Sequence, residues 1–283
     1  MIPGNLSREH LPPLRDVIED FGLGAKKSLG QHFLLDLNIT RKIARLSGLK
    51  AGETVIEIGP GPGGLTRALL ETGANVIAIE RDSRCIEALS MLNGPYEGTL
   101  TLIEDDAMKV DEVAILKEHG VSGPVRLASN LPYNISTELL IKWLKATPCW
   151  WTSLTLMFQK EVADRIIAPP GNKTYGRLGI ISQIASVPQK GFHLPAAAFT
   201  PPPKVDSSVL HFDPVQEVPC SIATLEKVTA AAFSQRRKML RASLKPLYGK
   251  RTEEILSAVD ILPTKRAEEI DVDGFIRLAN FES

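Results

Sequence analysis

The sequence is poor in cysteine and has no long hydrophobic run. Its three cysteines, Cys85, Cys149 and Cys220, lie far apart and match neither a metal-ligand spacing nor a disulfide framework. No apolar stretch approaches the roughly 18 residues that a membrane-spanning helix needs. The first residues carry Arg8 and Glu9 and lack the apolar core of a signal peptide. We therefore expect a cytoplasmic protein that binds no metal ion and does not enter a membrane.

The sequence also lacks a net charge, because 33 Lys and Arg balance 33 Asp and Glu. This average hides a local excess: residues 227–251 contain eight Lys or Arg and no Asp or Glu. A local basic face is what contact with nucleic-acid phosphates requires, whatever the total charge. A solvated helix face is the simpler alternative.

Short apolar runs alternate with helical patterns from about Thr54 onward. The runs at 55–58, 76–79, 100–103, 125–129 and 154–158 predict strands, and residues 65–71, 83–92 and 137–145 predict helices. Because the strand runs show no polar alternation, we expect them to be buried on both faces. The pattern predicts an α/β fold with a mostly parallel sheet.

The pattern changes after about Gln159. Residues 160–167 predict a helix, prolines make residues 199–206 stiff and extended, and residues 208–212 predict a late antiparallel strand. The remainder predicts helices at 221–244, 252–259, 264–269 and 274–281. We therefore expect a small all-helical C-terminal domain that begins near residues 216–221.

The segment Asn130-Leu131-Pro132-Tyr133 closes the predicted strand 125–129. In open α/β sheets, the chemistry lies at the carboxyl ends of the strands. The amide offers a carbonyl acceptor to an exocyclic amine, and the aromatic ring offers a stacking face to a base. The alternative is a simple proline turn with Tyr133 at its rim.

A glycine-rich loop, Gly59-Pro60-Gly61-Pro62-Gly63-Gly64, joins the first of these strands to a helix. Its spacing satisfies the dinucleotide fingerprint G-x-G-x-x-G. A pyrophosphate is held by backbone N–H donors, however, and Pro60 and Pro62 remove two of them. The loop therefore favours a ligand without phosphate, such as S-adenosylmethionine.

Polar residues end three predicted strands that are consecutive in the chain. Glu80 ends the second strand, 21 residues after Gly59, while Asp106 and Asn130 end the third and fourth. A parallel sheet brings such positions to one rim, where Glu80 can accept both ribose hydroxyls and Asp106 can accept the adenine amino group. The alternative is that the two acids are helix N-caps.

Motifs along the chain resemble those of the rRNA adenine N6,N6-dimethyltransferases, in the same order. The resemblance covers residues 26–281. Within that family, the sequence most resembles the bacterial small-subunit enzymes, which dimethylate two adjacent adenines near the 3′ end of 16S rRNA. The motifs that carry it are Gly30-Gln31-His32-Phe33-Leu34, Glu57-Ile58-Gly59-Pro60-Gly61, Glu80, Asp106-Ala107-Met108, Asn130-Leu131-Pro132-Tyr133, Gln159-Lys160-Glu161-Val162-Ala163, Tyr175-Gly176-Arg177-Leu178, the run from Phe199 to Ser207, and Phe233-Ser234-Gln235-Arg236-Arg237-Lys238.

The resemblance implies a Rossmann-like class I methyltransferase fold with a seven-stranded, mostly parallel sheet. It divides the chain into an extension (1–25), a methyltransferase domain (26–215) and a helical RNA-binding domain (216–283). It also implies S-adenosylmethionine as cofactor and 16S rRNA within the small ribosomal subunit as partner. We expect the protein to be a monomer. The implied cofactor-binding residues are His32, Leu34, Gly59, Gly61, Glu80, Asp106 and Asn130.

The implied catalytic residues are Asn130, Leu131, Pro132 and Tyr133, with Phe199 stacking on the target adenine from the other side. The family more often has asparagine at the position of His32, which leaves a contact through this side chain open. Among the basic residues, i, i+3 and i+4 spacings on a helix bring several to one face. Lys26-Lys27 either extends this track or is an exposed pair. The implied RNA-binding residues are Arg236, Arg237, Lys238, Arg241 and Lys245.

Three alternatives remain at this point. A large-subunit rRNA adenine methyltransferase of the macrolide-resistance type would share the cofactor and Asn130 motifs. A non-catalytic assembly factor would bind immature subunits without turnover. An NAD-dependent dehydrogenase would rest on the glycine fingerprint alone.

Overall fold

The computed structural model describes residues 11–24, 31–96 and 98–281. The chain folds into two compact units. The first comprises residues up to 140, 147–160 and 190–212, and the second comprises 141–146, 161–189 and 213–283. The predicted domain boundaries at 25/26 and 215/216 remain predictions; the sequence did not indicate that residues 161–189 cluster with the C-terminal helices.

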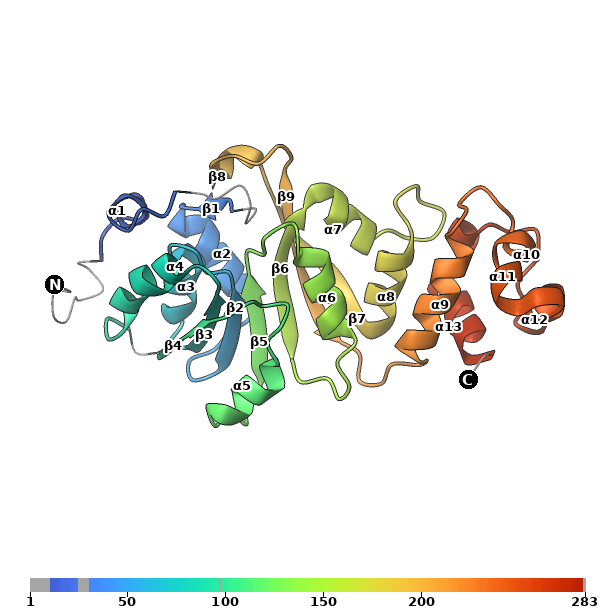
Figure 1. The fold of residues 1–283 in the computed structure, drawn as a ribbon, viewed down its shortest axis with the longest axis horizontal. Coiled ribbons are helices and arrows are strands. Elements are labelled where there is room, and N and C mark those ends of the chain that lie inside the picture. The colour runs from blue at the N-terminus through green and yellow to red at the C-terminus, as the bar shows by residue number, and fades with distance from the viewer. Residues whose placement is uncertain (1–10, 25–30, 97, 282–283) are drawn as a thin grey trace. The chain divides into compact units, whose positions relative to one another are not determined.

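A seven-stranded sheet organises the fold, in the order β4-β3-β2-β5-β6-β9-β7 (Figure 1). The strands from β4 to β6 are parallel, and β9 runs antiparallel to β6. Every predicted strand is present, and so is the predicted antiparallel one. The strands are β2 (Thr54–Ile58), β3 (Asn75–Glu80), β4 (Leu100–Glu104), β5 (Val125–Ser129), β6 (Ser153–Gln159), β7 (Ser186–Leu194) and β9 (Ser207–Pro214).

A separate two-stranded sheet pairs β1 (Phe33–Leu34) with β8 (Phe199–Thr200) in antiparallel orientation. Leu34 lies opposite Phe199 in this pairing. The contact joins two motifs that are far apart in the sequence, and a two-residue strand is too short for a periodic pattern to predict.

Helices follow the strands of the first unit. Asp36 caps α2 by accepting from the Asn38 N–H at 2.8 Å. The predicted helix at 65–71 is α3, and the one at 83–92 continues from α4 into a 3-10 turn that ends at Leu92. The helices here are α1 (Leu14–Asp20), α2 (Leu37–Leu46), α3 (Gly64–Leu70), α4 (Ser83–Leu89), α5 (Glu112–Glu118) and α6 (Ser136–Leu144), whose last residues belong to the second unit.

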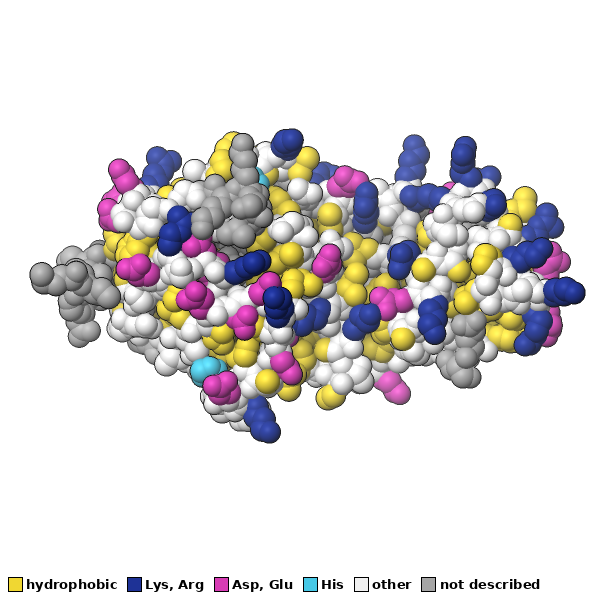
Figure 2. Space-filling view, viewed as in Figure 1, with side chains coloured by type: hydrophobic (Ala, Val, Ile, Leu, Met, Phe, Trp, Pro, Cys, Tyr) yellow, Lys and Arg dark blue, Asp and Glu magenta, His cyan; other side chains and the backbone are white. Residues whose placement is uncertain are grey.

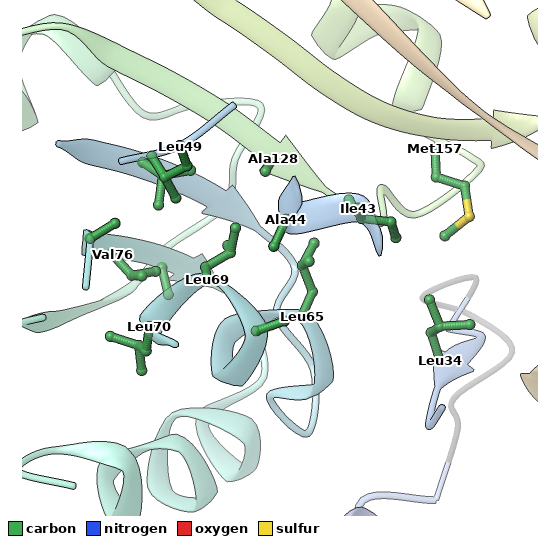
Figure 3. Packing of buried hydrophobic residues seen from close by; sticks show 14 of the residues in the cluster. Leu34, Ile43, Ala44, Leu49, Leu65, Leu69, Leu70, Val76, Ala128 and Met157 are labelled. Carbon is green, nitrogen blue, oxygen red and sulfur yellow. The ribbon is translucent and has the colours of Figure 1, made fainter. Parts of the chain in front are cut away.

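One hydrophobic cluster packs α2 and α3 against the sheet. Figure 3 shows Leu65, Leu69 and Leu70 of α3 close to Ala44 of α2, Val76 of β3 and Ala128 of β5. Ile77 and Ile79 alternate with Val76 and are also buried, so β3 is covered on both faces, as its unbroken apolar run predicts.

The second unit is helical around two strand ends. Ser221 caps α9 by accepting from the Thr224 N–H at 3.3 Å. Phe233 packs against both Tyr175 and Phe275, with ring centroids 6.3 and 5.8 Å away. The helices are α7 (Lys160–Ile166, whose first residue belongs to the first unit), α8 (Arg177–Ala185), α9 (Ile222–Ala232), α10 (Leu240–Ser243), α11 (Lys245–Tyr248), α12 (Thr252–Ala258) and α13 (Val272–Phe281).

The continuous helix predicted for 221–244 is wrong. α9 ends at Ala232, and residues 234–238 form turns before α10 begins. The chain leaves the helix because the Leu240 and Arg241 N–H groups donate to the carbonyl oxygens of Lys265 and Pro263. Residues 264–269 are likewise not an α-helix, and they contain a 3-10 turn at Ala267–Glu269.

Candidate active site and cofactor pocket

A pocket of about 210 Å³ opens where the parallel strands β2, β3, β4 and β5 end. It collects every residue that the sequence predicted for the cofactor, together with the whole Asn130–Tyr133 segment. The structure therefore brings these motifs to one rim, as the carboxyl ends of adjacent parallel strands require. The predicted residues that line it are His32, Leu34, Gly59, Gly61, Glu80, Asp106, Asn130, Leu131, Pro132 and Tyr133.

The glycine loop lines this pocket, and two of its glycines have positive φ angles that side chains disfavour. Gly61 has φ +56°, and a Cβ there would lie 3.1 Å from the Phe33 ring. Gly59 has φ +64°, and its Cβ would lie 3.4 Å from Pro132. Glycine at position 61 thus lets the loop approach β1 closely, and the positive φ favours glycine at both positions.

Three N–H groups of the loop are already used within the protein. The Gly59 N–H donates to Ile79, the Gly63 N–H to Pro60, and the Gly61 N–H to Oε2 of Glu80 at 3.2 Å. With Pro60 and Pro62 contributing no donor, residues 59–63 offer a pyrophosphate few free N–H groups.

Glu80 lies at the end of β3 and is 7% exposed. Its Oε1 accepts from the N–H groups of Arg81 and Asp82 at 2.8 and 2.9 Å. Burial raises the pKa of Glu80, and the three backbone N–H groups oppose that rise. Since a carboxylate has about four acceptor sites, one site on Oε2 remains for a ligand hydroxyl, whereas the sequence led us to expect that Glu80 accepts both ribose hydroxyls.

The alternative that Glu80 is a helix N-cap is wrong. Asp82 caps α4 instead, by accepting from the Arg84 N–H at 3.3 Å. Asp106 does hold a local turn, because its Oδ1 accepts from the Met108 N–H at 3.1 Å. Its Oδ2 faces Arg81 across the pocket rim, 3.6 Å from the guanidinium.

Asn130 has a fixed amide orientation. Its Nδ2 donates to the backbone carbonyl oxygen of His32 at 3.1 Å. A carbonyl oxygen accepts only, so the NH₂ group must face His32, and Oδ1 faces away from it. The site thus presents an acceptor oxygen at the end of β5, in the pocket that Tyr133 also lines.

His32 joins three parts of the site. Besides accepting from Asn130, it places its imidazole 5.6 Å from the Tyr133 ring centroid. Its Nδ1–H donates to the carbonyl oxygen of Pro201 at 2.8 Å. The His32 side chain thus contacts the proline-rich segment.

Tyr133 is fixed through its hydroxyl. That hydroxyl lies 2.6 Å from Oγ of Ser207, which is fully buried at the start of β9. Burial raises the pKa of Tyr133, and the bond to Ser207 opposes that rise. The ring is therefore neutral, oriented and only partly covered, which suits it to stacking.

Phe199 is the one predicted catalytic residue that does not line the pocket. Its side chain is 3% exposed and belongs to the hydrophobic cluster that also contains Leu34 and Met157. In this arrangement the ring has no free face for a base. Its role as the second stacking surface remains a prediction that needs the β1–β8 sheet to move.

The structure adds pocket residues that the sequence did not single out. Glu57 on β2 is 1% exposed and accepts from the Thr66 hydroxyl at 2.7 Å, and Arg81 and Met108 also line the pocket. Glu57 is the first residue of the motif Glu57-Ile58-Gly59-Pro60-Gly61. Its place in this motif was the only feature of the sequence that pointed to it. In the ranges that the structure describes, no group of acidic, histidine or cysteine side chains could hold a metal ion.

The predicted RNA-binding residues lie in the second unit, but not on one helical face. Arg236, Arg237 and Lys238 occupy the turns after α9, while Arg241 is in α10 and Lys245 begins α11. Arg236 is tied to Glu268 and to the Tyr175 carbonyl oxygen, both at 3.0 Å. The other four are exposed and form no ion pair with any described residue. Lys26-Lys27 lies outside the described residues.

Figure 2 shows Lys and Arg side chains gathered over the part of the second unit that contains α10, α11 and α12. The predicted basic surface therefore exists although its predicted helix does not. None of the described helices is long and apolar enough to cross a membrane.

Comparison with known proteins decides the family. A sequence model of the family described as "Ribosomal RNA adenine dimethylase" matches residues 22–282. The chain belongs to this family. It is 57% identical over 276 residues to the ribosomal RNA small subunit methyltransferase A of Xanthobacter autotrophicus, covering 96% of this chain and 94% of that protein. The protein of the same name from Rhizobium meliloti is 56% identical, over 95% and 97% of the two chains.

Solved structures of this class share the fold. A dimethyladenosine transferase from Plasmodium falciparum superposes with a TM-score of 0.75 at 28% identity, covering 87% of this chain and 96% of that one. The 23S rRNA methyltransferase ErmE superposes with a TM-score of 0.63 at 22% identity, over 88% and 98% of the chains, which shows a shared fold alone. The Rossmann-like class I methyltransferase fold expected from the sequence is thus confirmed.

Proposed function

We propose that this family member uses S-adenosylmethionine to dimethylate N6 of two adjacent adenines near the 3′ end of 16S rRNA in the small ribosomal subunit. The single observation that carries the proposal is the amide of Asn130, whose NH₂ group is engaged by the His32 carbonyl oxygen at 3.1 Å. An acceptor oxygen fixed at the end of β5 is what an exocyclic amine needs. The names of the relatives from Xanthobacter and Rhizobium support the small subunit as the source of that amine.

The pocket fits this cofactor by its chemistry. Glu80, Asp105 and Asp106 line it, and Arg81 is the one Lys or Arg among the described residues that do so. Such an acidic pocket favours a cation and repels a pyrophosphate, which disfavours the NAD alternative. S-adenosylmethionine, when bound, supplies a methyl group on a positively charged sulfur.

Each cofactor residue then has a defined task. Glu80 accepts from a ribose hydroxyl at its remaining Oε2 site. Asp106 accepts from the adenine amino group through Oδ2 after the Arg81 guanidinium has moved away from that oxygen. Leu34, Gly59 and Gly61 shape the wall against the adenosine. His32 contributes through its backbone, and its side chain contacts Pro201 and Tyr133 instead.

Asn130 and Leu131 prepare the target amine. N6 of adenine is a poor nucleophile, since its lone pair is delocalised into the ring. When Oδ1 of Asn130 and the Leu131 carbonyl oxygen accept its two hydrogens, the nitrogen becomes more tetrahedral and its lone pair points to the methyl carbon. Positioning supplies most of the acceleration in such a site, and the proton leaves after the methyl group has arrived.

Tyr133 holds the base by stacking, which is worth about 1–3 kcal/mol per base. The adenine must leave its stack in the RNA to reach this ring. Pro132 sets the turn that puts the ring beside the acceptors, and Phe199 adds a second face if β8 moves. The exposed cations Arg237, Lys238, Arg241 and Lys245 bind the RNA backbone.

Primer extension on both rRNAs, from cells with and without the gene, tests the proposed substrate. Two methyl groups on N6 block base pairing, so reverse transcriptase stops at the modified adenines. We expect the stop near the 3′ end of 16S rRNA to disappear when the gene is deleted. Loss of a stop in large-subunit rRNA alone would contradict the proposal and favour the macrolide-resistance class.

A further inference from the structure

Two glutamates lie in the cofactor pocket in very different surroundings. Glu80 accepts three backbone N–H groups, from Gly61, Arg81 and Asp82. Glu57 is 1% exposed, and the hydrogen bond that it accepts comes from the neutral hydroxyl of Thr66 at 2.7 Å. The two carboxyl groups lie on neighbouring strands, β2 and β3, and Glu80 acts on Glu57 as a like charge.

These surroundings separate the protonation of the two groups. A buried carboxylate with few donors and a negative neighbour holds its proton, whereas backbone N–H donors stabilise the ionised form. Burial raises the pKa of Glu57 to about 8, the charge of Glu80 adds to the rise, and the Thr66 bond opposes it. Near pH 7 Glu57 is therefore mostly neutral, and the backbone donors of Glu80 favour the negative charge of the pair on that group.

No described cation neutralises Glu57. The guanidinium of Arg81 faces Asp106 at the rim, and that of Arg67, the neighbour of Thr66 on α3, donates to the Pro12 carbonyl oxygen at 2.7 Å. The remaining titratable side chains that line the pocket are His32 before β1, Asp105 and Asp106 after β4, and Tyr133 after β5.

We infer that Glu57 is a proton-release site, which holds a proton while the pocket is empty and gives it to solvent when a cation binds beside it. The balance is simple, because the carboxylic acid becomes a carboxylate and the ligand keeps its positive charge. The inference rests on the proposed function, since S-adenosylmethionine is the cation. Glu57 is thereby a specificity residue, because its carboxylate stabilises a bound cationic ligand more than a neutral adenosine derivative of the same shape.

The inference predicts a pH-dependent affinity. Below about pH 8 the cofactor must displace the proton of Glu57, so its affinity rises with pH, by up to about tenfold per unit, and then levels off. Binding of the neutral 5′-methylthioadenosine displaces no proton, and its affinity does not follow this rise.

Calorimetric titration at pH 7 in buffers of different ionisation enthalpy counts the released protons directly. We expect the wild type to release about 0.9 proton more than Glu57→Gln on binding S-adenosylmethionine, as a pKa of about 8 requires. Taking the difference cancels any proton that the ligand itself exchanges. Glu104→Gln, which changes an exposed glutamate at the end of β4, should behave as the wild type.

Equal proton counts for the wild type and Glu57→Gln would overturn the inference, and so would equal release with 5′-methylthioadenosine. Failure of S-adenosylmethionine to bind the wild type at all would instead overturn the proposed function. If Glu57→Gln does not fold, infrared difference spectra of the wild type decide the matter. The carbonyl stretch of a protonated carboxyl group must be present in the empty enzyme at pH 7 and vanish on binding; an unchanged spectrum refutes the release.

Discussion

The hydroxyl of Tyr133 and Oγ of Ser207 lie 2.6 Å apart, so the residue that closes the Asn130 segment is bonded to the residue that ends the proline-rich segment. A second link runs beside it, from Nδ1 of His32 to the carbonyl oxygen of Pro201 at 2.8 Å. The proline-rich segment is therefore hydrogen-bonded to two residues of the candidate site, Tyr133 and His32, while Phe199 itself lies in the core.

Ser207→Ala tests the first link. It leaves the largely buried Tyr133 hydroxyl without its partner, which should lower the free energy of unfolding by about 1–3 kcal/mol and weaken binding of the target base. The neighbouring Ser208→Ala is a matched control, because Oγ of Ser208 is buried without a hydrogen-bond partner. Denaturant unfolding and RNA affinity measure both effects. Equal losses of stability and RNA affinity in the two variants would show that Ser207 has no specific role in the site.

Asn130→Asp tests the orientation of the amide. Aspartate cannot donate to the His32 carbonyl oxygen, so the acceptor loses its fixed position and gains a charge. We expect kcat to fall by about 100-fold or more, with cofactor affinity changed far less. Single-turnover kinetics and calorimetry separate the two quantities. Asn93→Asp, at an exposed asparagine, should leave both unchanged, and a similar kcat for Asn130→Asp would refute the proposed role.

The burial of Phe199 predicts a structural cost. Phe199→Ala should lower the free energy of unfolding by about 3–5 kcal/mol, because it empties a volume in the core next to Leu34 and Met157. Phe199→Leu should retain most of the stability. If the leucine variant is stable but binds the target base more weakly, the ring also reaches the base. A fully stable alanine variant would contradict the packing described above.

Glu57 predicts how the stability of the empty protein depends on pH. Its pKa is raised from 4.5 in the unfolded chain to about 8 in the folded protein, so between these values the folded state binds more protons. The contribution of Glu57 to the free energy of unfolding is therefore fully present below about pH 4.5 and is lost as the pH rises through about 8. The free energy of unfolding falls by up to about 1.4 kcal/mol per pH unit in this range. Thermal unfolding from pH 5 to 9 measures this slope. Glu57→Gln should flatten it, and an unchanged slope would assign the dependence elsewhere.

The basic turns of the second unit predict two different phenotypes for adjacent arginines. Arg237→Ala removes an exposed, unpaired cation, so it should lower RNA affinity and reduce the salt dependence of binding by about one ion, without changing stability. Arg236→Ala instead breaks the bonds to Glu268 and Tyr175, so it should lower the melting temperature. Filter binding at several salt concentrations, with thermal unfolding, distinguishes them. A reversed pattern would mean that Arg236 is the RNA contact.

The sequence predicted the sheet and the pocket because both depend on local signals. Apolar runs such as residues 125–129 locate buried strands, and a parallel sheet then brings Gly59, Glu80, Asp106 and Asn130 to one rim. It did not predict that residues 233–238 leave the helix, because that turn depends on hydrogen bonds with residues 263–265, which are distant in the chain.

The same limit explains Phe199 and Glu57. The burial of Phe199 follows from its pairing with Leu34, 165 positions earlier by subtraction of their numbers, and no local pattern encodes such a two-residue strand. The protonation of Glu57 depends on how few donors surround it, which only the folded arrangement reveals.

The most direct test of the central claim is mass spectrometry of rRNA nucleosides after purified protein, S-adenosylmethionine and unmethylated small subunits have reacted. The account predicts N6,N6-dimethyladenosine at two adjacent positions near the 3′ end of 16S rRNA, and none with the Glu80→Ala variant, which should still bind the RNA. The absence of dimethyladenosine with the wild-type protein, or equal methylation by Glu80→Ala, would contradict it.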